Sequence, residues 1–210
     1  MSKYLYVLVE SYFVKNICEF TAQSSFFYCT LYFVLMITVF YSPFIDAFFQ
    51  SNDTQELFDE DVVFYKDNLL SFLLGNDELI NNGFYSQREY IHMQDVKFLF
   101  DVANYLFFFS IIVFLFTYKS FSLLFYSRNI LLIIVFFIIT VVFFFKQLFT
   151  LFHKIFFRND YWLLPPDSSL IMMFPESFFV QIVFIILLVL LIVHGILLLF
   201  SKLHVRLTQK

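Results

Sequence analysis

Glycine, proline and charge are scarce in this sequence of 210 residues, which has 3 Gly and 4 Pro and is 14% charged. Soluble domains carry about 25% charged residues and about 45–50% apolar residues, whereas 61% of this chain is hydrophobic. A soluble fold of this length cannot bury so much apolar surface, so the composition excludes one. Because Gly- or Pro-rich linkers and internal repeats are also absent, residues 1–210 are expected to form a single integral membrane domain.

Cysteine and basic runs are similarly rare. Cys18 and Cys29 both fall on the expected inner side of the membrane, and neither belongs to a CxxC pair. A disulfide is therefore not expected, and no cofactor is expected either. The net charge is −4 without a basic run. Nucleic acid is therefore not an expected partner, whereas membrane lipid is.

Four apolar stretches are long enough to cross a bilayer, which takes about 20 residues at ~1.5 Å each. They predict an all-α fold with transmembrane helices at about 26–45, 99–118, 129–149 and 177–201. Basic residues outnumber acids at both ends of the chain and in the short turn between the second and third spans. By the positive-inside rule, both termini and this turn are cytoplasmic. The sequence thus predicts a multi-pass protein of the cell membrane.

Two segments remain for the outer side of the membrane, residues 46–97 and residues 150–176. The first is acidic, yet apolar residues recur through it, as in Leu69, Phe72 and Leu73. This pattern predicts an amphipathic helical lid on the membrane surface. The second contains Trp162 and the pair Pro165–Pro166, and it predicts an interfacial cap in which proline interrupts the helices.

A histidine and an acid share one helix face near the outer end of the second span. Ser86 and Glu89 have the spacing of a capping box, which starts a helix. In that helix Arg88, His92 and Asp95 lie on one side, because residues three and four apart are neighbours on a helix surface. The histidine and the aspartate should therefore project together, above the hydrocarbon.

His153 stands just beyond the outer end of the third span, at a depth similar to that of His92. A short turn joins the second and third spans, so they are antiparallel neighbours and both histidines are expected at one outer mouth. Three interpretations are open at this point: two structural histidines, a pair that transfers protons, or a metal site completed by Asp95 or Glu176. No HxxxH or HExxH spacing supports a metal, and none is expected.

The remaining polar groups near the spans are expected to be structural. His194 lies in the inner half of the fourth span and His204 follows it, so both are remote from the outer mouth. Asp101 lies in or beside the bilayer, where a charged side chain needs a partner. Lys97, one helical turn earlier, can supply it.

Three segments around these histidines resemble the motifs of a known family. They are residues 86–97 (SQREYIHMQDVK), 152–162 (FHKIFFRNDYW) and 170–179 (LIMMFPESFF). They are similar to signatures of the lipoprotein intramolecular transacylases (Lit), a Gram-positive family of membrane proteins with four spans. Their order and their placement around spans two to four also fit. The resemblance covers the chain from the first span to the fourth, and it leaves the residues before the first span without a role.

The resemblance implies a membrane acyltransferase whose substrate is a diacylated lipoprotein. The N-terminal cysteine of such a substrate carries diacylglycerol on its sulfur. One acyl chain, attributed in this family to the sn-2 position, would move from its glycerol ester to the α-amine of the same cysteine. The product would be a lyso-form lipoprotein with one chain left on glycerol.

This chemistry fits the two histidines, and we expect the site to face outward. An α-amine has a pKa near ~7.7 and attacks only when neutral, so a base is needed. A neutral histidine suits that task, and the tetrahedral oxyanion needs hydrogen-bond donors. We assign His92 as base and His153 as acid or oxyanion donor, with exchangeable roles; Asp95 would orient and tune His92. Supporting or substrate-binding roles are expected for Arg88, Glu89, Asp95, Arg158 and Trp162.

The alternative function is that of a non-catalytic small membrane subunit of a larger complex. Such a subunit would have no activity of its own, and it would tolerate the loss of either histidine.

Overall fold

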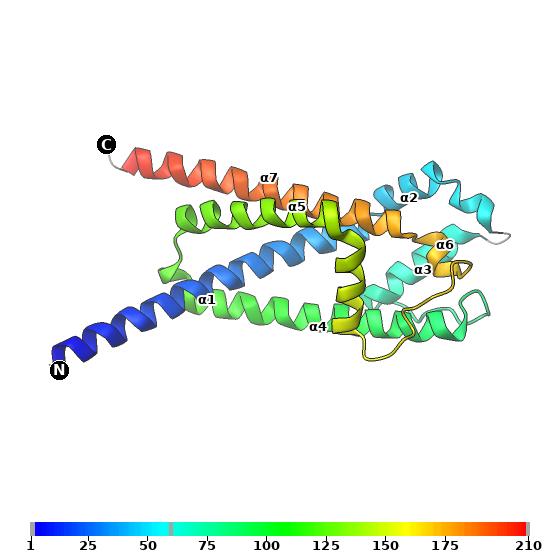
Figure 1. Ribbon diagram of the computed structural model, residues 1–210, viewed down its shortest axis with the longest axis horizontal. Helices are drawn as coiled ribbons and strands as arrows, with labels where there is room; N and C mark the ends of the chain where they lie inside the picture. The colour runs from blue at the N-terminus through cyan, green and yellow to red at the C-terminus, as the bar shows by residue number, and fades with distance from the viewer. Residues whose placement is uncertain (1–2, 59–60, 209–210) are drawn as a thin grey trace. The chain divides into compact units, whose positions relative to one another are not determined.

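The computed structural model describes residues 3–58 and 61–208, with side chains from residue 12 onward. Residues 59–60, which belong to the expected outer lid, lie outside the described residues. Throughout the described part the chain is helical or irregular and contains no strand (Figure 1).

Within residues 3–58 and 61–208, four helices are long and apolar enough to cross a membrane. They are α1 (Lys3–Phe40), α4 (Gln87–Thr117), α5 (Leu123–Phe156) and α7 (Glu176–Thr208). The shortest has 31 residues, more than the roughly 20 that cross a hydrocarbon core. Each helix therefore reaches beyond the hydrocarbon. The expectation of an all-α membrane protein with four spanning helices is confirmed.

The first helix ends earlier than the sequence predicted. The expected span 26–45 runs through Tyr41, where α1 has ended and α2 (Ser42–Ser51) is about to begin. Pro43 lies in the first turn of α2, where its missing N–H would have no helical partner in any case. The apolar run continues across the break because Ile45, now in α2, is buried in the lid.

Helix α5 bends at Phe144, whose φ of −133° and ψ of 23° are not helical. The expected span 129–149 therefore runs through this bend. The straight part from Leu123 to Phe143 is about 31 Å long at ~1.5 Å per residue, which matches one bilayer crossing. Residues 145–156 form a second helical stretch that turns away from the first, as Figure 1 shows, and this stretch carries His153.

Residues 46–97, the first expected outer segment, contain short helices before α4. They are α2, the 3-10 helix η1 (Thr54–Leu57) and α3 (Val62–Leu74). Asp61 caps α3 by accepting the backbone N–H groups of Val63 and Phe64 at 3.1 and 3.3 Å. Gly75 ends the same helix with a φ of +79°, a conformation that glycine adopts without steric cost. Helix α2 buries Ile45, Phe48 and Phe49 and is amphipathic, whereas α3 also exposes Val63, Phe64 and Leu74 and has no clear polar face.

By their internal contacts the residues form two compact units. Of the described residues, one unit comprises 3–35, 105–138 and 186–208, and it contains the turn η2 (Tyr118–Ser120). The other comprises residues 36–104 and 139–185, and it contains both expected outer segments and both candidate histidines. All four long helices contribute to both units.

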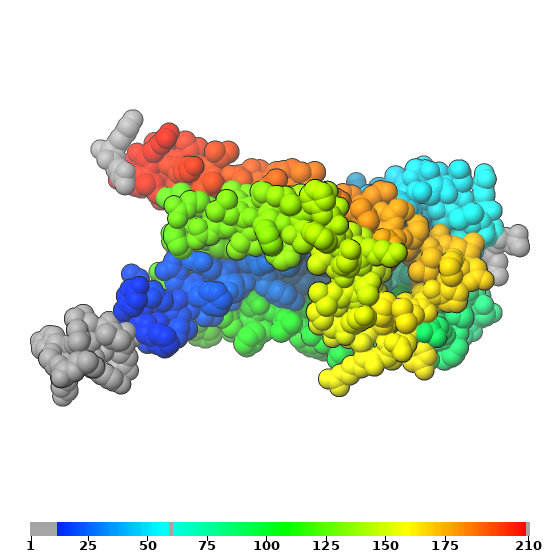
Figure 2. Space-filling view, in the orientation of Figure 1, coloured from blue at the N-terminus to red at the C-terminus, as the bar shows by residue number. Residues whose placement is uncertain are grey.

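Within the first unit, a buried pair joins α5 to α7. The Tyr126 hydroxyl donates to Nε2 of His194 at 2.8 Å, and Nδ1 of His194 donates to the Leu190 carbonyl at 2.8 Å. Because both imidazole nitrogens of His194 are used, this residue has the bonding of a structural histidine. Other large apolar side chains of α5 are exposed, among them Leu132, Phe136 and Phe143. Figure 2 shows α5 at the surface, where lipid would cover it.

Candidate active site

Helix α4 begins as the sequence predicted, at a capping box. The Ser86 hydroxyl accepts the Glu89 backbone N–H at 3.3 Å, and the Glu89 carboxylate accepts the Ser86 N–H at 2.8 Å. The second carboxylate oxygen of Glu89 accepts the Leu170 N–H of α6 (Ser169–Met173) at 2.7 Å. Glu89 is 2% exposed. Its carboxylate therefore joins the start of α4 to α6 and is turned away from solvent.

The second unit brings His92 and His153 together. His92 lies in the second turn of α4 and His153 in the stretch of α5 beyond the bend. The two ring centroids are 6.0 Å apart, with ring planes inclined at 33°. Both side chains are buried, at 7% and 8% exposure. Two imidazoles from separate helices thus share one desolvated space.

Aromatic rings enclose this histidine pair. Phe157 contacts both imidazoles, with centroids 5.0 Å from His92 and 5.4 Å from His153. His153 also lies 4.3 Å from Phe149 and 5.0 Å from Trp162. Rings at these separations pack closely, and they leave both imidazoles buried. The surroundings therefore suit an acyl ester, which is itself apolar apart from its carboxyl group.

Hydrogen bonding distinguishes the two imidazoles. Nδ1 of His153 lies 2.7 Å from the Phe149 carbonyl oxygen. Because a carbonyl can only accept, this nitrogen carries the proton, and Nε2 is left with the lone pair. Nδ1 of His92 is buried without a hydrogen-bond partner. A buried polar atom without a partner is costly, and it is typical of a group that receives its partner from a substrate.

Asp95, which was expected to orient and tune His92, contacts the loop between α5 and α6. Its carboxylate accepts from Nδ2 of Asn159 at 2.8 Å, while Nδ1 of His92 has no partner. Asn159 lies in the loop between α5 and α6. The carboxylate of Asp95 therefore anchors the loop and makes no hydrogen bond to Nδ1 of His92.

Arg88 holds the same loop from one face of α4. Its Nη2 donates to the carbonyl oxygen of Asp160, and its guanidinium lies 5.8 Å from the centre of the Tyr161 ring. Its Nε is buried without a partner, one helical turn from the unpartnered Nδ1 of His92. Of the other expected supporting residues, Trp162 touches His153, whereas Arg158 is exposed.

A buried cation stabilises the lid. Lys66 is 1% exposed and forms ion pairs with Asp46, which is in α2, and with Asp67 at 2.9 Å. The hydrogen bond from Lys66 lowers the pKa of Asp46 below its ordinary value. Burial by itself would lower the pKa of Lys66, but the bonds to both aspartates outweigh it, and the pKa is raised. The pair therefore fixes α2 against α3 with both groups charged.

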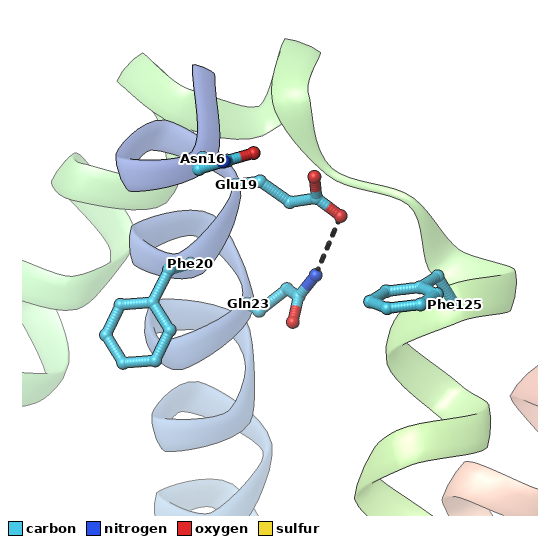
Figure 3. Close-up of a pocket in the computed structure, with 5 residues that line it drawn as sticks. All are labelled: Asn16, Glu19, Phe20, Gln23 and Phe125. Atoms are coloured by element: carbon cyan, nitrogen blue, oxygen red, sulfur yellow. Dashed lines mark hydrogen bonds between the residues drawn. The ribbon is translucent and has the colours of Figure 1, made fainter. Parts of the chain in front are cut away.

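Two cavities lie away from the histidines. Figure 3 shows one of about 430 Å³ in the first unit, lined by Asn16, Glu19, Phe20, Gln23 and Phe125. Its one acid, Glu19, accepts a hydrogen bond from Gln23 at 3.1 Å. The other, of about 580 Å³, lies beside Lys66 in the lid. Neither is lined by a histidine or a cysteine, so the enclosed histidine pair is the better candidate site. Among the described residues, no cluster of three or more His, Cys, Asp or Glu side chains could hold a metal ion.

Sequence reasoning missed three residues of this site. Phe149 and Phe157 pack against the imidazoles; nothing distinguishes Phe149 within a chain of 36 phenylalanines, whereas Phe157 lies in the segment 152–162 that resembles a family motif and was given no role of its own. Asn159 was also missed, although an Asn-Asp pair between an apolar helix and Tyr161 is a signal for a turn closed by the asparagine side chain.

Comparison with known proteins identifies a family for this chain. Residues 20–179 match the sequence profile of the family described as lipoprotein intramolecular transacylase Lit. No curated protein matches the chain. The solved structure of the membrane-integral lipoprotein intramolecular transacylase Lit from Bacillus cereus is 21% identical, with a TM-score of 0.77 over 93% of this chain and 98% of that one.

Structures of two variants of the Bacillus cereus protein are equally similar. In one, a histidine is replaced by arginine; it is 20% identical and has a TM-score of 0.78 over 99% of both chains. In the other, alanine replaces the histidine, with 21% identity and a TM-score of 0.78 over 96% of this chain and 98% of that one. These likenesses establish the fold, and the profile match covers most of the sequence. The chain belongs to the family of lipoprotein intramolecular transacylases.

Proposed function

We propose that this protein moves one acyl chain of a diacylated lipoprotein from its S-diacylglyceryl group to the α-amine of the same N-terminal cysteine. One observation carries the proposal beyond membership of the family. Two buried imidazoles from different helices lie 6.0 Å apart within an enclosure of aromatic rings. A base and an acid are what aminolysis of an ester requires, and the enclosure excludes the water that would hydrolyse it.

His153 acts as the base, through Nε2. Its Nδ1–H is donated to the Phe149 carbonyl, so Nε2 holds the lone pair that accepts the proton of the attacking amine. This exchanges the roles that we assigned from the sequence. The amine nitrogen forms a bond to the ester carbonyl carbon, and the carbon–oxygen bond to glycerol then breaks. The glycerol oxygen leaves as a hydroxyl, and the proton that it gains is the one taken from the amine, passed on by the His153 imidazolium directly or through His92.

Two groups of α4 are available to stabilise the tetrahedral oxyanion. The Nε–H of Arg88 and Nδ1 of His92 are both buried and unpartnered, one turn apart. Arginine is always charged in proteins, so its Nε–H is a permanent donor. Donors fixed before the reaction stabilise developing charge without the cost of reorientation. No serine or cysteine nucleophile is needed, because the attacking amine is tethered to the ester.

The site faces outward, and both termini are cytoplasmic. This orientation is supported by the basic residues near the chain ends and in the turn at η2, which the positive-inside rule assigns to the cytoplasm. It is also supported by the division into units, because both histidines belong to the unit that contains the two outer segments. Outward placement suits the substrate, whose lipidated cysteine lies at the outer surface of the membrane.

The test uses the purified chain in lipid vesicles and a synthetic S-diacylglyceryl-cysteine peptide. An internal acyl shift does not change the mass of the substrate, so an intact mass is uninformative. The readouts are fragmentation spectra, which place the acyl chain on nitrogen or on glycerol, and the reactivity of the α-amine toward an acylating reagent. We expect the amine to become unreactive as the N-acyl fragment appears.

An amine that stays reactive throughout would overturn the proposal. It would leave the alternative of a non-catalytic membrane subunit, which predicts no change in the peptide under any condition. Loss of an acyl chain to water would instead indicate a lipase. The fragmentation spectra distinguish these two outcomes from each other.

A further inference from the structure

We propose that Asn159 is a positioning residue for the acyl shift, and that Asp95 acts through it to hold Trp162 against His153. The inference rests on the proposed function for its catalytic consequence, but the contact that it assigns can be measured without any substrate. It assigns Asp95 a mechanical role in the site, which is distinct from the electrostatic role expected from its position on α4.

Asn159 uses both ends of its side-chain amide. Nδ2 donates to the carboxylate of Asp95 at 2.8 Å, which ties the loop to α4. Oδ1 accepts the backbone N–H of Tyr161 at 3.0 Å, which closes a turn two residues long. The next residue is Trp162, whose ring centroid lies 5.0 Å from that of His153. The direction of this indole is therefore set by a turn that a helix residue holds in place.

A second anchor lies two turns away on the same face of α4. The Arg88 guanidinium donates to the carbonyl oxygen of Asp160 and lies over the Tyr161 ring. Arg88 and Asp95 are separated by seven residues, and His92 falls between them on this face. The two anchors thus fix the loop on both sides of His92. Each bond is charge-assisted, which makes it roughly twice as strong as a neutral one.

The two roles of Asp95 predict opposite results when its side chain is exchanged with that of Asn159. If Asp95 positions the loop, the exchanged pair should serve as well as the natural pair. The amide would then donate from α4 to a carboxylate on the loop, and the other oxygen of that carboxylate could still accept the Tyr161 N–H. If Asp95 acts by its charge near His92, moving that charge into the loop should not restore activity.

The experiment compares Asp95→Asn, Asn159→Asp and the double variant in the full chain. Asn159→Asp alone places a second carboxylate against that of Asp95, and the two repel each other. The rate should then fall by about 10²-fold, the size expected for a misplaced catalytic group. Asp95→Asn alone leaves an amide–amide bond and should lower the rate by about fivefold, because a neutral hydrogen bond is weaker. The double variant should recover to at least the rate of Asp95→Asn.

Trp162 provides a readout that is independent of activity, because it is the one tryptophan of the chain. Its emission wavelength and intensity report its exposure and its contact with the imidazole. We expect Asn159→Asp to shift the emission to longer wavelength, and the double variant to restore the natural spectrum. Two exposed residues of the outer segments provide matched controls: Asn81→Asp and Asp167→Asn should change neither spectrum nor rate.

Two results would overturn the proposal. The first is a double variant that is no more active than Asn159→Asp, together with a larger loss of rate in Asp95→Asn than in Asn159→Asp. This result would show that Asp95 acts through its charge near His92. The second is an emission spectrum that none of the variants alters. If the natural chain fails to shift the acyl group, the proposed function fails, and the spectra still decide whether Asn159 positions Trp162.

Discussion

At His153, one nitrogen is committed to the helix backbone and the other is free for chemistry. At His92, the buried Nδ1 has no protein partner at all. The two imidazoles are therefore not equivalent, although both lie in the same aromatic enclosure. The site thus consists of three groups. His153 is a base with a fixed tautomer, His92 has an Nδ1 that can bond to a substrate, and Arg88 has an Nε–H donor without a partner.

Loss of either histidine should abolish the acyl shift. His92→Ala and His153→Ala each remove a proton-transfer group, which is worth about 10²–10⁴-fold in rate. The protein should still accumulate in the membrane, because neither side chain is essential to the helix in which it lies. Fragmentation of the substrate peptide measures the rate, and immunoblots of membrane fractions measure the amount of protein.

His204→Ala, at an exposed position, is the control for general effects of histidine loss. His194→Ala should also stay active, although losing the bond to Tyr126 should lower thermal stability. If His194→Ala were as inactive as His153→Ala at equal amounts of folded protein, the chemistry would belong to the first unit.

The reaction should need no metal. Prolonged dialysis against EDTA should leave the rate unchanged, because the proposed steps use only imidazole and guanidinium groups. A metal site would instead lose its ion to the chelator, and activity would return with zinc. The measurement is the initial rate before dialysis, after it, and after addition of zinc.

Local sequence signals succeeded where the interaction is local. The capping box of Ser86 and Glu89 spans four residues, and the ion pair of Lys97 with Asp101 spans one turn. Both were predicted and both are present. The bond between Asp95 and Asn159 joins residues 64 positions apart. No pattern within one segment of sequence predicts such a pair, because it depends on how the loop crosses α4.

Among the helices of the lid, α2 and α3 are joined by an ion pair between buried Lys66 and Asp46, whose side chain is 44% exposed. Asp46 has a lowered pKa because Lys66 donates to it, so its contribution to stability is present above its ordinary pKa of 3.8. That contribution is lost as the pH falls through the lowered value. Lys66 has a raised pKa, so its contribution is complete below the ordinary value of 10.5. It is lost as the pH rises through the raised value.

The melting temperature should therefore fall at both ends of the pH range. In Asp46→Asn the acidic fall below about pH 4 should become shallower, because the unfolded chain no longer binds a proton at this position. Glu56→Gln removes an exposed acid of the same lid and is the matched control. A pH profile of Asp46→Asn that coincides with that of the natural chain would show that the pair contributes nothing measurable.

The helices themselves were easier to predict than their interruptions. Apolar runs of sufficient length identified all four spanning helices. The bend at Phe144 falls in the run FFFKQ, which contains neither proline nor glycine, so no residue signals it. The break between α1 and α2 does contain Pro43. The apolar run continues through it, however, because the buried side of the lid is as hydrophobic as a membrane span.

For the molecule as a whole, the orientation in the membrane can be measured directly. In a chain with Cys18→Ser and Cys29→Ser, single cysteines are placed by Asn81→Cys in the outer segment and Ser122→Cys in the turn after η2. Both positions are exposed. We expect an impermeant maleimide to label intact cells at position 81 and to label position 122 only after lysis. The reverse pattern would place the histidines on the cytoplasmic side.

The bend in α5 also links the enzyme to the thickness of its membrane. The straight part before Phe144 is about 31 Å long, and a typical hydrocarbon core is about 30 Å thick. In a thinner bilayer this part must tilt, or the lipid must thicken around it. Either response changes the depth of His153, while the glycerol ester of the substrate follows the lipid headgroups. The rate should therefore be highest in vesicles of matched thickness, and should fall in lipids with shorter or longer chains.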